Sequence, residues 1–177
     1  MATETKFARS DLAVDADGTF AGYASLFDQA DLGRDVVMPG AFRASLAKRG
    51  AAGIKMLYQH DPNQPIGVWE EVREDTRGLR VRGRLTTDVV KAREVLSLMR
   101  AGALDGLSIG YRTVRGRTDS KTGLRRLIEV DLWEISVVTF PMLPDARVAA
   151  VKGHEQAALV TAIERATRTV RAAIPGM

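Results

Sequence analysis

The feature that most constrains the fold is a pair of long strand-like segments in the second half of the chain. Residues 106–117 (GLSIGYRTVRGR) and 125–140 (RRLIEVDLWEISVVTF) are rich in β-branched, aromatic and other apolar residues. The polar stretch TDSKTG lies between them and has the composition of a turn. Consecutive strands joined by a short turn pair antiparallel. The sequence therefore predicts a long antiparallel β-hairpin over residues 106–140.

Shorter elements are predicted on both sides of this hairpin. Apolar or alternating residues predict strands over 19–27, 54–59, 66–72 and 79–85, and Pro62 is expected to stop pairing and force a turn just after His60. Helices are predicted over 39–50 and 89–102, each closed by glycine, and from His154 onward. Because strands predominate, we expect an α+β fold, a closed or strongly curved antiparallel β-barrel surrounded by a few helices.

Two residue counts exclude several classes of site. The 177-residue chain has no cysteine and two histidines, so thiol catalysis, cysteine-based zinc sites, disulfide scaffolds and histidine-rich metal centres are excluded. Any histidine chemistry has to use His60 or His154. The first residues lack the apolar core of a signal peptide, and no apolar run approaches the roughly 18 residues of a membrane span. We therefore expect an intracellular protein that does not engage a membrane.

The basic excess is small and says little about partners. The formal net charge is +4, from charges of both signs spread along the chain. The densest basic stretch falls on the predicted hairpin, at Arg112, Arg115, Arg117, Lys121, Arg125 and Arg126. Tyr111 is the one aromatic residue there that could stack on a base, so we do not expect nucleic acid as a partner. The stretch is better explained as a solvated hairpin.

Ser108 is the candidate nucleophile. The segment GLSIG at 106–110 matches the G-x-S-x-G elbow of α/β-hydrolases, but an elbow needs a helix directly after the serine and this sequence continues as a strand. Flanking glycines nevertheless allow close backbone approach, and a serine hydroxyl needs an adjacent base. His60 is better placed than His154, which is expected at an exposed helix start. The alternative interpretation is that Ser108 and His60 are ordinary turn residues.

A carboxylate could orient that histidine. Strand periodicity places five residues on one face of the predicted strand over 128–138: Val130, Leu132, Glu134, Ser136 and Val138. Glu134 interrupts an otherwise aliphatic face, where a carboxylate is costly unless it is hydrogen-bonded or paired. A histidine N–H is one suitable partner, and an arginine is the alternative. Asp131 and Glu129 lie on the other face and are more easily explained as solvated charges.

Four segments together resemble the prohead protease family of tailed bacteriophages. They are GYASLFDQADLGRDVVMPGAF, KMLYQHD, GALDGLSIGY and LIEVDLWEISVVTFPMLPDARV, in that order and spacing, and they cover about Phe20 to Val151. The family is similar to herpesvirus assemblins, serine proteases on a closed antiparallel barrel ringed by helices. The resemblance implies a protease domain over residues 1–152, followed by a C-terminal amphipathic helix over 153–177 that packs on the barrel or serves in targeting or dimerisation.

The resemblance also implies site residues. The family's histidine falls on His60 and its serine on Ser108. Assemblins use a second histidine as the third member, but this chain has none between His60 and His154, so an acidic member is implied. Glu134 is favoured by strand parity, with Asp131 and Glu129 in reserve. For the oxyanion, the only candidate in the corresponding region is Arg147, on a loose match, and we do not assign that role.

The resulting hypothesis is a serine endopeptidase of capsid maturation. It would act without a metal or organic cofactor, inside the assembling prohead in the host cytoplasm, on a scaffold segment or the major capsid protein precursor, and on itself in some assemblies. Homodimer formation is left open. Two other classes compete with this hypothesis. A non-catalytic capsid assembly or scaffold-binding protein would keep Ser108 and His60 apart, and a nucleic-acid-binding module would bind through the basic hairpin with strong salt dependence.

Overall fold

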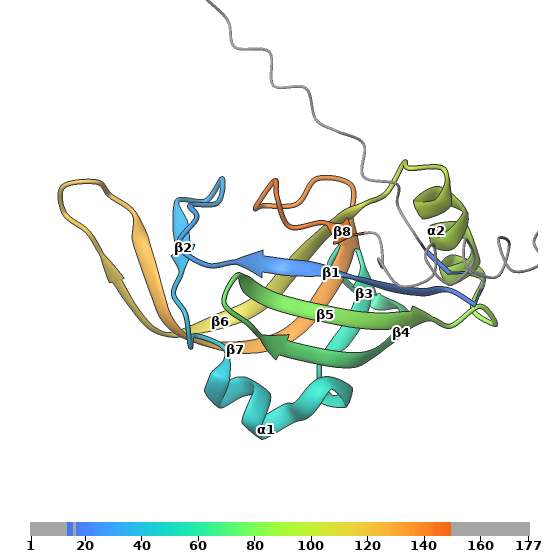
Figure 1. Cartoon of the computed structure of the whole chain (residues 1–177), viewed down its shortest axis with the longest axis horizontal. Coiled ribbons are helices and arrows are strands. Elements are labelled where there is room, and N and C mark those ends of the chain that lie inside the picture. The colour runs from blue at the N-terminus through green and yellow to red at the C-terminus, as the bar shows by residue number, and fades with distance from the viewer. Residues whose placement is uncertain (1–13, 16, 150–177) are drawn as a thin grey trace, which may run out of the picture.

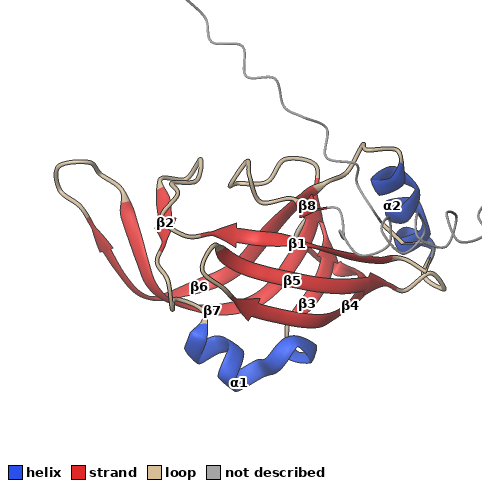
Figure 2. Cartoon of the chain, in the orientation of Figure 1, coloured by secondary structure: helices blue, strands red, loops and turns tan. Residues whose placement is uncertain are grey.

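The protein is described by a computed structural model, which places residues 14–15 and 17–149. The described elements form one curved sheet with two helices (Figures 1 and 2). In chain order they are β1 (Thr19–Leu26), β2 (Asp35–Val37), α1 (Arg43–Gly53), β3 (Lys55–Tyr58), β4 (Asp61–Glu74), β5 (Gly78–Leu85), α2 (Val90–Arg100), β6 (Gly106–Thr118), β7 (Arg125–Val138) and β8 (Val148–Ala149).

The predicted hairpin forms the longest ladder of the sheet. Strands β6 and β7 pair antiparallel from Gly106 opposite Val138 to Thr118 opposite Arg125. The end of the hairpin extends away from the rest of the molecule (Figure 1). Its basic side chains are largely solvent-exposed, as the sequence indicated. The hairpin prediction is therefore confirmed. The observed pairing fixes which residues of the two strands face one another.

The sheet is strongly curved, but it is not a fully closed barrel. Its strands follow the order β2-β7-β3-β4-β5-β1-β8, and β6 lies on the other edge of β7. In the part of the chain that the structure describes, the short segment 146–149 links β1 to the start of β6: β8 pairs with β1, and the Leu107 N–H donates to the Ala146 carbonyl at 2.8 Å. The expected curvature is confirmed, whereas full closure is not.

Two strand pairings differ from the all-antiparallel arrangement that we expected. Strands β2 and β3 both run parallel to β7, one opposite Arg125–Leu127 and the other opposite Glu134–Val137. Helix α1 connects them, and parallel neighbours require such a crossover. Between the two short strands, the Ser45 hydroxyl of α1 accepts the Leu132 N–H at 2.8 Å. The helix thus satisfies part of the β7 edge that no strand covers.

A single apolar core fills the concave side of the sheet and the contact with the helices. Phe20 and Trp69 pack edge to face inside it, with ring centroids 5.6 Å apart. Helix α2 buries Ala92, Val95, Leu96 and Met99 at the predicted helical spacing, and Gly102 follows it with a φ of 72°. The core therefore holds β6, β7 and the strands around them in one body.

Some predictions fall outside the described residues. The C-terminal helix over 153–177, His154 and the division of the chain after residue 152 all lie beyond Ala149, so these stay predictions. Within the described part of the chain, no helix has the length and apolar character needed to span a membrane.

Candidate active site

His60 lies in a tight turn between β3 and β4. Tyr58 pairs with Asp61, and the two residues between them, Gln59 and His60, have φ values of 54° and 61°. Two consecutive residues with positive φ are the signature of a type I′ hairpin turn, which usually uses asparagine and glycine. The turn therefore precedes Pro62 and β4 continues through that proline, so Pro62 does not stop the strand as we expected.

Hydrogen bonds to β7 hold this strained turn in place. The Gln59 N–H donates to the Val137 carbonyl at 3.1 Å, and the His60 N–H donates to the Ser136 hydroxyl at 3.1 Å. Residues without a glycine's freedom pay a cost in this backbone region, so they persist only where surrounding contacts over-determine them. The parallel pairing of β3 with β7 supplies those contacts and brings His60 above the β6–β7 ladder.

Ser108 and Glu134 lie on adjacent strands. Ser108 of β6 is opposite Ser136 of β7, and Gly110 is opposite Glu134. Ser108 is 6% exposed, and the Glu134 side chain is 13% exposed. A Cβ atom on Gly110 would lie only 1.9 Å from Oε1 of Glu134. The second glycine of GLSIG is therefore explained by the space that the carboxylate occupies.

The three predicted side chains form one hydrogen-bonded chain. His60 Nδ1 lies 2.6 Å from Glu134 Oε1, and His60 Nε2 lies 2.9 Å from Ser108 Oγ. An ionised carboxylate can only accept, so Nδ1 carries the proton of the neutral ring. Nε2 is then the acceptor for the Ser108 hydroxyl. This is the tautomer that a histidine needs in order to take a proton from a serine.

The environment tunes the basicity of His60. The hydrogen bond that His60 Nδ1 donates to Glu134 raises the pKa of His60 above its ordinary value, partial burial opposes that shift, and the negative charge of Glu134 reinforces it. The ring is accessible, since 42% of the His60 side chain is exposed. A more basic ring that stays in contact with solvent is suited to exchanging protons near neutral pH.

Ser136 completes the arrangement and was missed as a site residue. It is fully buried, its hydroxyl donates to Glu134 Oε2 at 2.6 Å, and its oxygen accepts the His60 backbone N–H. Ser136 thus contacts both the acid and the turn that carries the histidine. Strand parity could have indicated it, because Ser136 shares a face with Glu134 and is polar in an aliphatic series.

The reserve candidates have other partners. The Asp131 carboxylate pairs with Arg49 at 2.7 Å and accepts the Trp133 indole N–H at 2.8 Å. Glu129 lies 4.0 Å from Arg115. Neither contacts His60 within the described part of the chain, so of the three carboxylates considered only Glu134 does.

Arg147 is also engaged elsewhere. Its guanidinium donates to the Pro144 carbonyl at 2.7 Å and pairs with Asp105. These contacts close the loop after β7 and leave the side chain in a structural position. The oxyanion role that the resemblance raised for it is not assigned.

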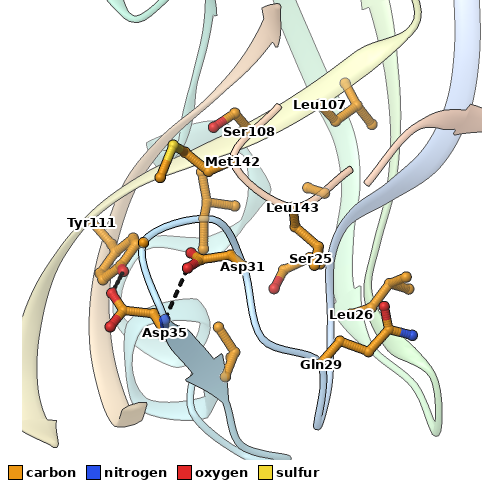
Figure 3. A pocket seen from close by; sticks show the side chains of 14 residues that line it. Ser25, Leu26, Gln29, Asp31, Asp35, Leu107, Ser108, Tyr111, Met142 and Leu143 are labelled. Carbon is orange, nitrogen blue, oxygen red and sulfur yellow. Dashed lines mark hydrogen bonds between the residues drawn. The ribbon is translucent and has the colours of Figure 1, made fainter. Parts of the chain in front are cut away.

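A cavity of about 130 Å³ opens beside Ser108 (Figure 3). Strand β6 forms one wall through Leu107, Ser108 and Tyr111, and the loop after β7 contributes Met142 and Leu143. In the residues that the structure describes, no three histidine or acidic side chains gather in a way that could hold a metal ion.

On this strongly curved sheet, a serine, a histidine and a carboxylate are hydrogen-bonded in that order. This is the arrangement found in serine hydrolases, and it is recognised by its geometry and not by the order of the residues in the sequence. The sequence profile described as Caudovirus prohead serine protease matches residues 4–159. The chain therefore belongs to the caudovirus prohead serine protease family.

Two relatives carry the name prohead protease. That of Enterobacteria phage HK97 is 37% identical over 138 residues, which cover 76% of this chain and 60% of the relative. That of Escherichia phage T5 is 27% identical over 138 residues, which cover 76% of this chain and 64% of the relative. The matched region thus spans less than two thirds of either relative.

Two solved structures share the fold. The bacteriophage T4 capsid assembly protease superposes with a TM-score of 0.53 at 16% identity, covering 68% of this chain and 80% of that one. The KSHV protease, solved with a hexapeptide phosphonate inhibitor, superposes with a TM-score of 0.51 at 12% identity, covering 73% and 63%. At these identities the likeness extends to the fold alone, and it agrees with the assemblin-like sheet that we expected.

Proposed function

We propose that the protein is a serine endopeptidase in which Ser108 is the nucleophile, His60 the general base and acid, and Glu134 the group that orients His60. The observation that carries this proposal is the unbroken chain of hydrogen bonds from Ser108 Oγ through the imidazole to Glu134. A non-catalytic assembly protein has no need of this geometry. The 2.9 Å distance between Ser108 and His60 therefore favours the enzyme over that alternative.

The reaction follows from the position of each proton. His60 Nε2 accepts the Ser108 proton as Oγ attacks the peptide carbonyl, and Glu134 stabilises the imidazolium that forms. The imidazolium then donates its proton to the leaving amine, which releases the first product and leaves an acyl-enzyme on Ser108. Water, deprotonated by His60, hydrolyses the ester and regenerates the serine. No step uses a metal or an organic cofactor.

The substrate that we propose is a capsid protein precursor or its scaffold segment. Family membership and two relatives named prohead protease support this assignment. The enzyme would then act inside the assembling prohead in the host cytoplasm, with residues 1–152 as its protease domain. Dimer formation is not required by the chemistry, because Ser108, His60 and Glu134 come from one chain.

Cleavage of the coat precursor by purified variants tests the proposal. Ser108→Ala and His60→Ala are each expected to lower kcat by about 10⁶-fold, the loss that follows removal of either group from such a triad. Ser120→Ala, in the exposed hairpin turn, is the matched serine control and should cleave at the wild-type rate. A phosphonate probe should label Ser108 in the wild type. Unimpaired cleavage by Ser108→Ala would overturn the assignment.

A further inference from the structure

The cavity beside Ser108 is large enough to hold a long side chain. Its volume is about 130 Å³, whereas one buried water needs roughly 10–15 Å³ by this measure. Ser108 is part of its lining, so whatever fills the cavity contacts this residue. The walls contain apolar side chains from three parts of the fold, Leu26, Leu107 and Leu143.

Two carboxylates also line this cavity, and they differ in charge balance. Asp35 is 8% exposed and is compensated, since Arg125 donates to it through Nε at 2.7 Å and Nη2 at 2.5 Å. The Tyr111 hydroxyl donates to the same carboxylate at 3.0 Å. The Arg125 guanidinium holds the pKa of Asp35 below its ordinary value. Asp35 therefore adds little net charge to the cavity.

Asp31 forms no such ion pair with any residue that the structure describes, although its charge helps to raise the pKa of the nearby Arg125. The two carboxylates and one guanidinium together therefore leave one net negative charge. Its Oδ1 accepts the Asp35 backbone N–H at 2.8 Å (Figure 3). Within the described residues, the ion pairs of the protein leave Asp31 without an arginine, lysine or histidine partner. The cavity that touches Ser108 thus combines apolar walls with one negative charge. A side chain with an apolar stem and a cationic end matches both features.

We propose that this cavity binds the side chain of the residue whose carbonyl Ser108 attacks, and that Asp31 makes it selective for lysine or arginine. The inference rests on the proposed function. We assign the cavity to the residue on the acyl side of the cleaved bond, because the Cα of that residue is bonded directly to the attacked carbonyl carbon. The next residue is separated from that carbon by the peptide nitrogen. A cavity that Ser108 helps to line is therefore reached first by the acyl-side residue.

Peptides that end in aminomethylcoumarin test this subsite, because their leaving group carries no side chain. Three substrates differ only at the last residue: lysine, norleucine, which has the same apolar stem without the charge, and glutamate. We expect a wild-type kcat/KM for lysine about tenfold or more above that for norleucine, the effect of one charge-assisted hydrogen bond. Glutamate should be the poorest of the three.

Asp31→Asn separates charge from structure. The asparagine Oδ1 can still accept the Asp35 N–H, so the loop keeps its hydrogen bond while the charge is removed. We expect the lysine-to-norleucine ratio to fall to about one, and Asp31→Lys to place glutamate above lysine. Each ratio is taken within one variant, so a general loss of activity cancels. Asp28→Asn, exposed in the same loop and outside the cavity lining, should keep the wild-type ratio.

The outcomes separate the two proposals. An unchanged lysine-to-norleucine ratio in Asp31→Asn, or a wild type that prefers norleucine or glutamate, overturns the subsite while the peptidase assignment stands. Failure of the wild type to cleave all three peptides, together with no phosphonate labelling of Ser108, overturns the proposed function and the subsite with it.

Discussion

Alanine at position 110 would place a methyl group where the Glu134 carboxylate lies. The added Cβ would be 1.9 Å from Oε1 and 2.7 Å from Cδ of Glu134. Real Cβ atoms do not approach other heavy atoms below 3.0 Å. Repulsion at shorter distances therefore has to move Glu134 Oε1 by more than about 1 Å. The backbone has little freedom to absorb this shift, because Gly110 and Glu134 are partners in the β6–β7 ladder.

This displacement is larger than the His60–Glu134 hydrogen bond tolerates. Its length is 2.6 Å, and such bonds are lost beyond about 3.2 Å. A misplacement of about 1 Å costs roughly 10²-fold in rate, and complete removal of a triad acid costs about 10⁴-fold. We therefore expect Gly110→Ala to lower kcat/KM by between about 10² and 10⁴-fold. Overpacking should also lower the free energy of unfolding by about 1–3 kcal/mol.

The assay is peptide or coat-precursor cleavage, with urea unfolding of each variant to measure its stability. Gly116→Ala on the same strand is the matched control, because the nearest atoms to a Cβ there are the Thr113 side chain at 3.3 Å and the Arg126 carbonyl at 3.4 Å. It should stay within about twofold of the wild-type rate. A folded Gly110→Ala variant that is as slow as predicted separates loss of the triad geometry from loss of the fold.

A double-mutant cycle sharpens the test. Once Glu134 is alanine, the clashing carboxylate is absent, so Gly110→Ala should cause little further loss of activity. The double variant is expected to match Glu134→Ala within about twofold, since coupled residues do not behave additively. Wild-type activity in Gly110→Ala, or a double variant whose losses multiply, would refute the reasoning.

Two further predictions concern His60 and its support. Because Glu134 raises the pKa of His60 and only the neutral ring can accept a proton, the acidic limb of kcat/KM should lie above the ordinary value of 6.5. In Glu134→Gln only the opposing burial remains, so the limb should move to lower pH; a pH profile that does not move contradicts this. Ser136→Ala removes the donor to Glu134 and the acceptor of the His60 N–H, and kcat should fall about tenfold with KM little changed. A wild-type kcat for Ser136→Ala would leave the residue no positioning role.

Local patterns in the sequence were sufficient for several elements. The strand-like composition of 106–117 and 125–140, with a polar turn between them, predicted the β6–β7 hairpin. The register that the structure shows then places Ser108 opposite Ser136 and Gly110 opposite Glu134. Helical spacing likewise predicted α2 and its buried face. These predictions succeeded because side-chain direction in a strand or helix repeats over a few residues. Strict periodicity was wrong about the face of Glu134: the register shifts at Trp133, so Val130 and Leu132 lie in the core together with Ile135 and Val137, and Glu134 does not share their face.

What the sequence determined by itself is thus most of the strands, both described helices, the β6–β7 hairpin and the choice of Ser108, His60 and Glu134 as candidates, whereas the short strands β2 and β8 were not predicted. Only the tertiary structure decided that β2 and β3 run parallel to β7, that the His60 turn precedes Pro62, and that Ser136 contacts both His60 and Glu134. It also decided that Asp31 and Ser108 line one cavity. These features depend on segments up to 90 residues apart in the chain, as for Asp35 opposite Arg125, and no local periodicity encodes which distant edges meet.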